Sequence, residues 1–172
     1  MAKLRTIPLM GWIKEHQHLL KPPVGNKNLY NEGGFMVFVV GGPNERTDYH
    51  IDPLEEIFYQ IKGDMLLKIV EDGAFRDLTI REGEIFLLPA NVPHSPQRFE
   101  GSIGLVAEYA RPEGELDGLR WYCPKCEATV YEEWFHLTDT TTQLAPVFER
   151  FYNSIEARTC PACGNLHPSP SE

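Results

Sequence analysis

Short apolar runs follow one another through the middle of the chain. The run FMVFVV at 35–40 is continuous and predicts a strand that is buried on both faces. EIFYQI, MLLKIV, AFRDLTI, EIFLL and IGLVAEY follow it, separated by turn signals such as KGD and EDG. Short strands with regular turns and no alternating helices favour an all-β sandwich or barrel from Phe35 to Ala110.

Helical spacing is confined to two segments outside this β region. Apolar residues recur at helical intervals from Leu9 to Leu20, and Pro22 and Pro23 end that segment. A second helix is predicted from Pro146 to Ala157, after a further strand candidate, TVYEEWFHL. The sequence therefore predicts a mainly β chain with a helix near each end.

The stretch RPEG, which begins at Arg111, is the best candidate for a domain boundary because the pattern changes beyond it. We expect residues 1–112 to form a β-barrel with an N-terminal helix. Residues 113–172 are expected to form a smaller C-terminal lobe that packs on the barrel.

Composition and charge narrow the classes of function. The chain has 172 residues, 42% of them hydrophobic, with 16 Lys and Arg against 25 Asp and Glu, for a net charge of −9. This balance and the lack of a basic run argue against a nucleic-acid partner. No apolar stretch approaches the roughly 18–20 residues that span a bilayer, and Lys14 and Glu15 interrupt any signal-like core. We therefore expect a cytosolic protein without a membrane partner.

Two stretches, 46–63 and 83–98, contain the residues of a candidate metal site. His50, Glu56 and His94 form a potential set of two histidines and one carboxylate. Strand alternation places Glu56 on the same face as buried apolar residues, where a carboxylate needs a compensating partner such as a cation. The ligand types suit Fe(II), Mn(II) or Zn(II), and three ligands leave positions open for a substrate and O2.

The spacing of these residues resembles the two-part pattern of the cupins. The first part is represented by Gly42, Asp48, His50, Glu56 and Gly63. The second part is represented by Gly83, Pro89 and His94. Asp48 replaces the usual first histidine and the gap from His50 to Glu56 is one residue longer than usual, while Asn91 and Arg98 replace a Gly and an Asn. The resemblance implies a jelly-roll β-barrel, with fewer protein ligands than an ordinary cupin unless Asp48 joins His50, Glu56 and His94.

Four segments together resemble one family, the bacterial 3-hydroxyanthranilate 3,4-dioxygenases. They are RTDYHIDPLEE, FLLPANVPHSPQR, LDGLRWYCPKC and CPACGNLHP, and the resemblance covers nearly the whole chain. It implies an Fe(II) ion held by His50, Glu56 and His94. The implied reaction converts 3-hydroxyanthranilate and O2 to 2-amino-3-carboxymuconate semialdehyde, the precursor of quinolinate in the kynurenine pathway. The resemblance also implies a homodimer.

The same resemblance implies roles for further polar residues. Arg98 would pair with the substrate carboxylate, and Arg46 would stabilise negative charge developing near O2. Glu108 would accept a hydrogen bond from the substrate, which would also contact Glu56. Asn26 and the loop that precedes it, from Pro22, would close over the site, and Asp48 would lie beside the ligands without binding the metal. Without the resemblance, Arg46 and Arg98 would be rim salt bridges and Glu108 an exposed strand charge.

The four cysteines form two C-x-x-C pairs separated by 33 residues. Cys123, Cys126, Cys160 and Cys163 therefore predict a tetrahedral four-thiolate site for iron or zinc, with a rubredoxin-like CPxCG sequence at the second pair. Because no ligand position is left open, a structural role is favoured over electron transfer. Two disulfides are the minor alternative.

Two other functions remain compatible with the sequence. One is a cupin oxygenase that acts on a different hydroxylated aromatic acid. The other is a metal-binding cupin that senses a small molecule without consuming O2, because the cupin fold hosts many functions.

Overall fold

The computed structural model describes residues 5–20, 25–44, 46–139 and 142–169. The helices are α1 (Leu9–His16), α2 (Leu144–Tyr152) and α3 (Ile155–Arg158), with a 3₁₀ turn at Gln17–Leu19. The strands are β1 (Asn26–Glu32), β2 (Phe35–Gly41), β3 (Asp48–Ile51), β4 (Glu56–Lys62), β5 (Met65–Glu71), β6 (Ala74–Ile80), β7 (Ile85–Leu88), β8 (His94–Arg98), β9 (Ile103–Tyr109), β10 (Asp117–Tyr122) and β11 (Thr129–Phe135).

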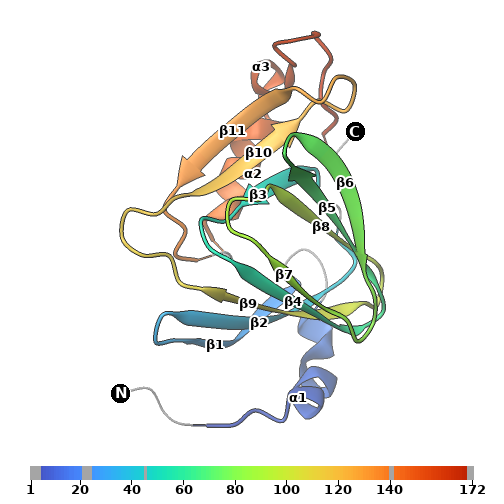
Figure 1. Ribbon diagram of the computed structural model, residues 1–172, viewed down its shortest axis with the longest axis vertical. Coiled ribbons are helices and arrows are strands. Elements are labelled where there is room, and N and C mark those ends of the chain that lie inside the picture. Colours follow the sequence, from blue (N-terminus) through green and yellow to red (C-terminus); the bar gives the residue numbers. More distant parts are fainter. Residues whose placement is uncertain (1–4, 21–24, 45, 140–141, 170–172) are drawn as a thin grey trace.

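The strands form two antiparallel sheets that face each other (Figure 1). One sheet has the order β1-β2-β9-β4-β7 and the other has the order β11-β10-β3-β8-β5-β6. Strands β2 to β9 alone give β2-β9-β4-β7 opposite β3-β8-β5-β6, which is the jelly-roll arrangement of the cupins. The β-barrel that the sequence predicts is therefore confirmed.

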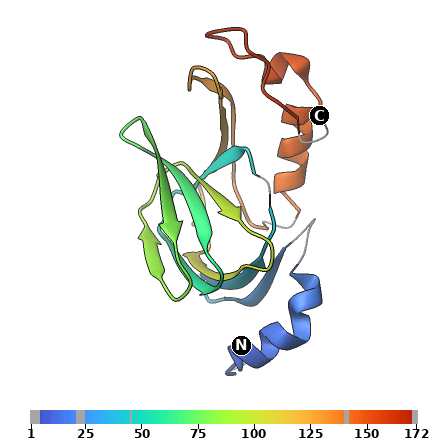
Figure 2. The same cartoon turned by 90° about the vertical axis from the view of Figure 1, so that its right-hand side faces the viewer.

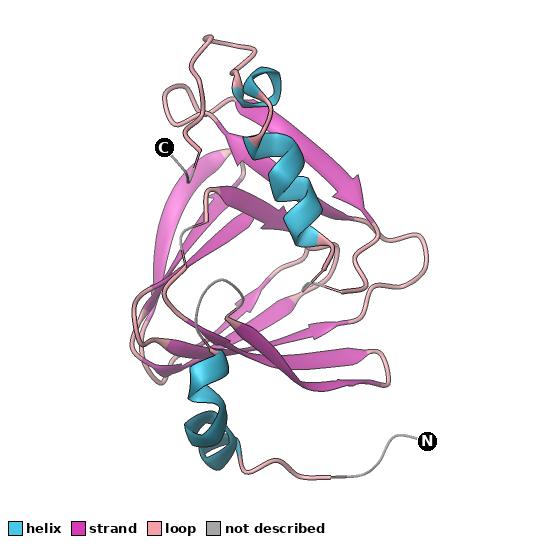
Figure 3. Cartoon of the chain, turned by 180° about the vertical axis from the view of Figure 1, so that it is seen from behind, coloured by secondary structure: helices cyan, strands magenta, loops and turns pink. Residues whose placement is uncertain are grey.

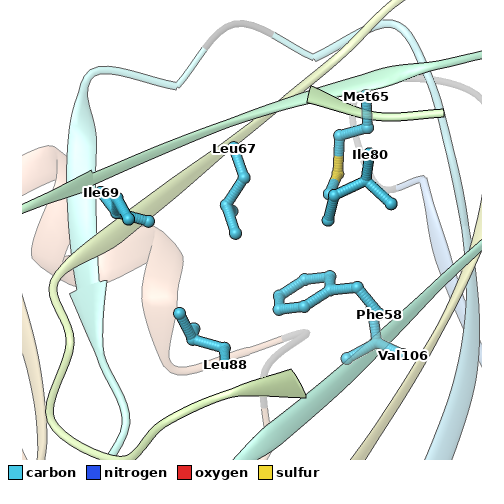
Figure 4. Close-up of a cluster of buried hydrophobic side chains, with 7 residues drawn as sticks. All are labelled: Phe58, Met65, Leu67, Ile69, Ile80, Leu88 and Val106. Atoms are coloured by element: carbon cyan, nitrogen blue, oxygen red, sulfur yellow. The ribbon is translucent and has the colours of Figure 1, made fainter. Parts of the chain in front are cut away.

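An apolar cluster fills the interior between the sheets (Figure 4). Phe58, Leu88 and Val106 come from β4, β7 and β9, and they face side chains of β5 and β6 from the other sheet. The side chains of β5 and β6 are Met65, Leu67, Ile69 and Ile80. Alternation along β4 that turns Phe58 inward also turns Glu56 and Gln60 inward, so polar groups line the same interior.

Strand β2 is covered on both faces, as its continuous apolar sequence predicts. Phe38 and Val40 pack against the barrel cluster, whereas Val39 is buried with Ile13 of α1. The predicted N-terminal helix is shorter than expected, because the α-helix ends at His16 and continues only as the 3₁₀ turn. Figures 1 and 2 show α1 at one end of the molecule and the helices α2 and α3 at the other.

The C-terminal segment extends one barrel sheet. Strand β10 pairs with β3, and α2 packs against the extended sheet (Figure 3). Trp121 of β10 stacks on Phe151 of α2 with ring centroids 4.3 Å apart. The single helix predicted from Pro146 to Ala157 is wrong. Ser154 adopts an extended conformation between α2 and α3, and its hydroxyl accepts a hydrogen bond from the Ala157 amide as an N-cap.

The proposed division into residues 1–112 and 113–172 stays a prediction. Strands β10 and β11 of the second part belong to the same sheet as β3 of the first part. Within the described residues, no helix combines the length and apolar character needed to cross a membrane.

Candidate active site and four-cysteine cluster

The three predicted metal ligands converge inside the barrel. His50 lies on β3 directly opposite His94 on β8, and Glu56 opens β4 in the facing sheet. One ligand atom from each residue lies within 4.8 Å of the others. Oε1 of Glu56 is 3.1 Å from Nε2 of His94 and 3.6 Å from Nδ1 of His50. Residues 44 positions apart in sequence thus share one buried point.

Hydrogen bonds on the far side of each imidazole fix which nitrogen faces this point. His94 Nδ1 lies 3.0 Å from the carbonyl oxygen of Val92, an acceptor only, so Nδ1 holds the proton. His50 Nε2 lies 2.8 Å from Oδ1 of Asp117 and donates to that carboxylate. The remaining nitrogen of each ring therefore presents a lone pair toward Glu56, as metal-binding histidines do.

A divalent cation fits the point where these atoms meet. Glu56 Oε1 is buried and has no hydrogen-bond partner among the described residues, although both imidazoles are close. Two lone-pair nitrogens and one carboxylate are a donor set for Fe(II), Mn(II) or Zn(II).

Arg98 is a buried cation that no carboxylate neutralises among the described residues. It is 4% exposed, and in the described part of the chain Nη1 donates to the neutral side chain of Gln60, at 3.3 Å. Burial, with the charge of Arg46, lowers the pKa of Arg98 to about 10, so it stays protonated at neutral pH. The Asn44 side chain accepts from the Arg98 amide at 2.6 Å and fixes the backbone. An anionic group of a ligand would complete this arrangement.

Arg46 and Asp48 form an ion pair at the start of β3. Nε of Arg46 donates to Oδ1 of Asp48 at 3.1 Å, and a second bond joins Nη2 to Oδ2. Asp48 is not part of the cluster of ligand atoms. This contact supports the interpretation that Asp48, at the position of the usual cupin histidine, orients Arg46 and does not bind the metal.

Glu108 is only 3% exposed, so it is not an exposed strand charge. It lies on β9 opposite Glu56, and its Oε1 accepts a hydrogen bond of 2.6 Å from Nη1 of Arg111. Burial, together with the charge of Glu56, raises the pKa of Glu108 to about 7. The side chain is therefore held beside the candidate metal point and can accept or hold a proton there.

Asn26 lies at the start of β1, where it pairs with Val40 of β2. It is half-buried, and its predicted contact with a substrate stays a prediction. Residues 22–24 of the predicted closing loop, which runs from Pro22 to Asn26, lie outside the described residues.

Three buried charges beside the site are absent from the sequence prediction. Arg111 contacts both Asp52 and Asp117, and Asp117 also binds His50. Arg111 was expected to lie in a domain boundary, but its side chain is completely buried. Arg111 and Asp52 are 59 positions apart, so neither periodicity nor a local motif could reveal their contact.

The four cysteines come together at the end of the β10–β11 hairpin. Sγ of Cys123 is 3.6 Å from Sγ of Cys163, and Sγ of Cys126 is 3.6 Å from Sγ of Cys160. A disulfide needs about 2.05 Å, so the disulfide alternative is wrong. Sulfurs around a tetrahedral metal at about 2.3 Å lie about 3.8 Å apart, which matches these separations.

The two C-x-x-C loops have the same backbone geometry. The amides of Glu127 and Gly164 donate to the carbonyls of Cys123 and Cys160, four residues earlier, at 2.9 Å in both loops. Both Glu127 and Gly164 adopt a positive φ, of 62° and 70°. The arrangement holds all four thiolates around one point and leaves no position for a substrate.

Comparisons with a family model and with individual known proteins indicate the same family. A family model described as 3-hydroxyanthranilic acid dioxygenase matches residues 1–152. The 3-hydroxyanthranilate 3,4-dioxygenase of Xanthomonas euvesicatoria pv. vesicatoria (strain 85-10) is 57% identical over 164 residues, covering 95% of this chain and 93% of its own. The proteins of the same name from Shewanella woodyi and Jannaschia sp. (strain CCS1) are each 56% identical over 98% of this chain, covering 89% and 94% of their own lengths.

Solved structures show more distant likeness. Protein NMB1881 from Neisseria meningitidis is 25% identical, with a TM-score of 0.49 over 61% of this chain and 99% of its own. A cupin-2 domain containing protein from Shewanella frigidimarina is 16% identical, with a TM-score of 0.47 over 56% of this chain and 91% of its own.

Proposed function

This chain belongs to the 3-hydroxyanthranilic acid dioxygenase family, and we propose that it is an Fe(II)-dependent ring-cleaving dioxygenase. Its substrates would be 3-hydroxyanthranilate and O2, and its product 2-amino-3-carboxymuconate semialdehyde, the precursor of quinolinate. The observation that carries this proposal is the pairing of a His50, Glu56 and His94 cluster with the uncompensated cation of Arg98. The cluster suits a metal, and Arg98 suits a carboxylated ligand.

When bound by His50, Glu56 and His94, Fe(II) would supply the electron exchange between an aromatic ring and O2 that the amino acids cannot perform. The protein would orient the side chains that bind the metal, and it would orient the substrate. Val92 and Asp117 orient the metal-binding side chains, because their hydrogen bonds set the direction of His94 and His50.

Arg98 would bind the carboxylate of 3-hydroxyanthranilate. Its planar guanidinium can form two parallel hydrogen bonds to one carboxylate, which fixes both the position and the plane of the ring. Met65, on the neighbouring strand, pairs with Arg98 and provides an apolar wall beside it. This wall strengthens the ion pair by excluding water.

Glu108 and Arg46 would act on the reacting groups. Glu108 can accept a hydrogen bond from the substrate hydroxyl and hold its proton, since the pKa of Glu108 is raised to about 7 by burial and by Glu56. Arg46, oriented by Asp48, would stabilise negative charge that develops as O2 is reduced.

The four-cysteine cluster would hold a second iron, or zinc, with a structural role. It joins the turn between β10 and β11 to the segment after α3, so one ion would fasten the lobe of residues 113–172. Four thiolates in this arrangement suit a reducing compartment, and we place the protein in the cytosol.

The chain would assemble as a homodimer. Edge strand β7 exposes Ile85 and Leu87, at 70% and 58%, beside Tyr59 of β4 on the outer face of the sheet. An apolar face next to an open sheet edge favours pairing with a second copy. Light scattering after size-exclusion chromatography tests the dimer, and Leu87→Lys should shift it toward a monomer.

The decisive experiment measures O2 consumption by anaerobically purified protein that is reconstituted with Fe(II) and given 3-hydroxyanthranilate. Stoichiometric O2 uptake with a ring-opened chromophore that later decays supports the dioxygenase. Tight binding without O2 uptake would instead favour a sensor. Absence of both would indicate another hydroxylated aromatic acid as substrate, to be sought with a panel of such acids.

A further inference from the structure

The guanidinium of Arg111 uses all five of its N–H donors inside the protein. Nε and Nη2 donate to Asp117 at 2.7–3.0 Å, and Nη2 also donates to Asp52 at 2.6 Å. Nη1 donates to Glu108 at 2.6 Å and to the carbonyl oxygen of Tyr109 at 3.0 Å. One fully buried cation thus binds three carboxylates from three separate segments.

Two of those carboxylates lead directly to the candidate active site. Oδ1 of Asp117 accepts from Arg111 and also from Nε2 of His50, a candidate metal ligand. Glu108, on β9 of the facing sheet, lies directly opposite Glu56, another candidate ligand. Arg111 therefore lies one side chain away from both a ligand and a substrate contact, although it touches neither the metal point nor the substrate position itself.

We propose that Arg111 is a positioning residue for the reaction, which fixes His50 through Asp117 and holds Glu108 toward the substrate. The first half concerns the metal site alone. The second half rests on the proposed function, because it assumes that Glu108 meets the substrate hydroxyl.

The geometry shows why His50 needs this support. A neutral imidazole can carry its proton on either nitrogen, and only the Nε2–H form leaves the Nδ1 lone pair facing Glu56. Asp117 selects this form by accepting from Nε2. Asp117 is itself held by bonds from Nε and Nη2 of Arg111, so it cannot rotate away from His50 without breaking them.

General stability is a weaker explanation for this network. A buried ion pair often contributes little to folding, because desolvation of the charges offsets their attraction. The carboxyl groups of Asp52, Glu56, Glu108 and Asp117 lie near the metal point, with the guanidinium of Arg111 among them. A divalent ion at His50, Glu56 and His94 would bring further positive charge to this acidic region.

The test compares metal binding by full-length protein freed of metal and titrated with Co(II) under anaerobic conditions. Cobalt bound to four thiolates absorbs intensely through charge transfer, whereas cobalt bound to imidazole and carboxylate gives weak bands, so the two sites are followed separately. The variants are Arg111→Lys and Asp117→Asn. Glu133→Gln is the control, because it makes the same kind of change at a carboxylate that binds another arginine, Arg150, and lies outside the cluster of ligand atoms.

Arg111→Lys and Asp117→Asn should weaken Co(II) binding at the histidine site by roughly 10- to 100-fold, the usual range for groups that orient metal-binding histidines. Filling of the four-cysteine site should be unchanged and reports that the protein is folded. Glu133→Gln should change the affinity by well under tenfold. In the Fe(II)-loaded enzyme, Arg111→Lys should lower kcat more than it raises KM, since Arg98 still binds the carboxylate.

Unchanged Co(II) affinity in Asp117→Asn would overturn the proposal even if Arg111→Lys failed to fold, because Asp117→Asn keeps the guanidinium. An equal loss in Glu133→Gln would also overturn it, since the loss of any pair between a carboxylate and an arginine would then explain the effect. If the wild type bound Co(II) but did not turn over 3-hydroxyanthranilate with Fe(II), the proposed function would fail, while the Co(II) comparison would still decide the role of Arg111 at His50.

Discussion

A Cβ atom added to Gly104 would lie 2.4 Å from Nη1 of Arg98. The glycine on β9 therefore provides the space that the buried guanidinium occupies. Gly104→Ala should displace Arg98 and raise KM for 3-hydroxyanthranilate by about tenfold or more, because small misplacements of an orienting group are costly. Steady-state kinetics measure this change, and kcat should fall less than KM rises.

Gly11→Ala is the matched control for this substitution. The nearest atom to a Cβ at Gly11 is 3.9 Å away, an ordinary contact, and Gly11 lies in α1 away from the candidate site. This variant should keep the wild-type KM. If Gly104→Ala also kept it, Arg98 would not be the carboxylate contact.

Loss of the Arg98 guanidinium should be specific to substrates with a carboxylate. Arg98→Gln removes a charge-assisted contact of roughly 1.5–3 kcal/mol and should raise KM for 3-hydroxyanthranilate by about 10- to 100-fold. The KM of Arg98→Lys should lie between those of the wild type and Arg98→Gln, because an ammonium keeps the charge but cannot form the paired bonds. The comparison substrate is 2-aminophenol, which has the same hydroxyl and amine but no carboxylate. Equal losses on both substrates would contradict this role for Arg98.

The two metal sites should be separable by mutation. His50→Ala, Glu56→Ala and His94→Ala each remove one of three ligands and should abolish ring cleavage and Fe(II) binding inside the barrel. The metal held by the four cysteines should remain, because no residue is shared between the two clusters. Metal analysis of each variant measures this, and full turnover in any of them would disprove the assignment of ligands.

The apolar strands of the barrel are visible in the sequence, whereas several polar ones are not. Buried and more exposed positions alternate along β4, β5 and β9, because one face of each strand packs against the core. These strands are therefore rich in apolar residues. Strand β3 reads DYHI and β8 reads HSPQR, and neither suggests a strand, although both are largely buried. Their inward side chains bind other polar groups in place of the apolar core, so the strands that build the site lack an apolar signal.

The spacing of the motif identified the candidate metal ligands, but it could not identify the residues that orient them. His50 and Glu56 are only six positions apart, so a short sequence motif contains both of them. Asp117 contacts His50 across 67 positions, through the pairing of β10 with β3. Such a contact depends on the register of two strands, which a single sequence does not specify.

The first C-x-x-C loop contains a side chain at a position that favours glycine. Glu127 is exposed and has a φ of 62°, and its counterpart in the second loop is Gly164, with a φ of 70°. A side chain in this left-handed region is strained, whereas glycine is not. Glu127→Gly should therefore increase the stability of the metal-loaded protein by about 0.5 to 1 kcal/mol, seen as a higher midpoint of denaturant unfolding.

Gly164→Ala supplies the opposite change at the equivalent position and should lower the midpoint, because a Cβ atom enters the same left-handed conformation. Nothing lies within 4 Å of a Cβ at Gly164, so steric contact with neighbours would not explain the loss. Both variants should retain the four-thiolate metal, since no cysteine changes. A lower midpoint for Glu127→Gly would mean that the Glu127 side chain contributes more than its backbone strain costs, and the assumed equivalence of the two loops would be wrong.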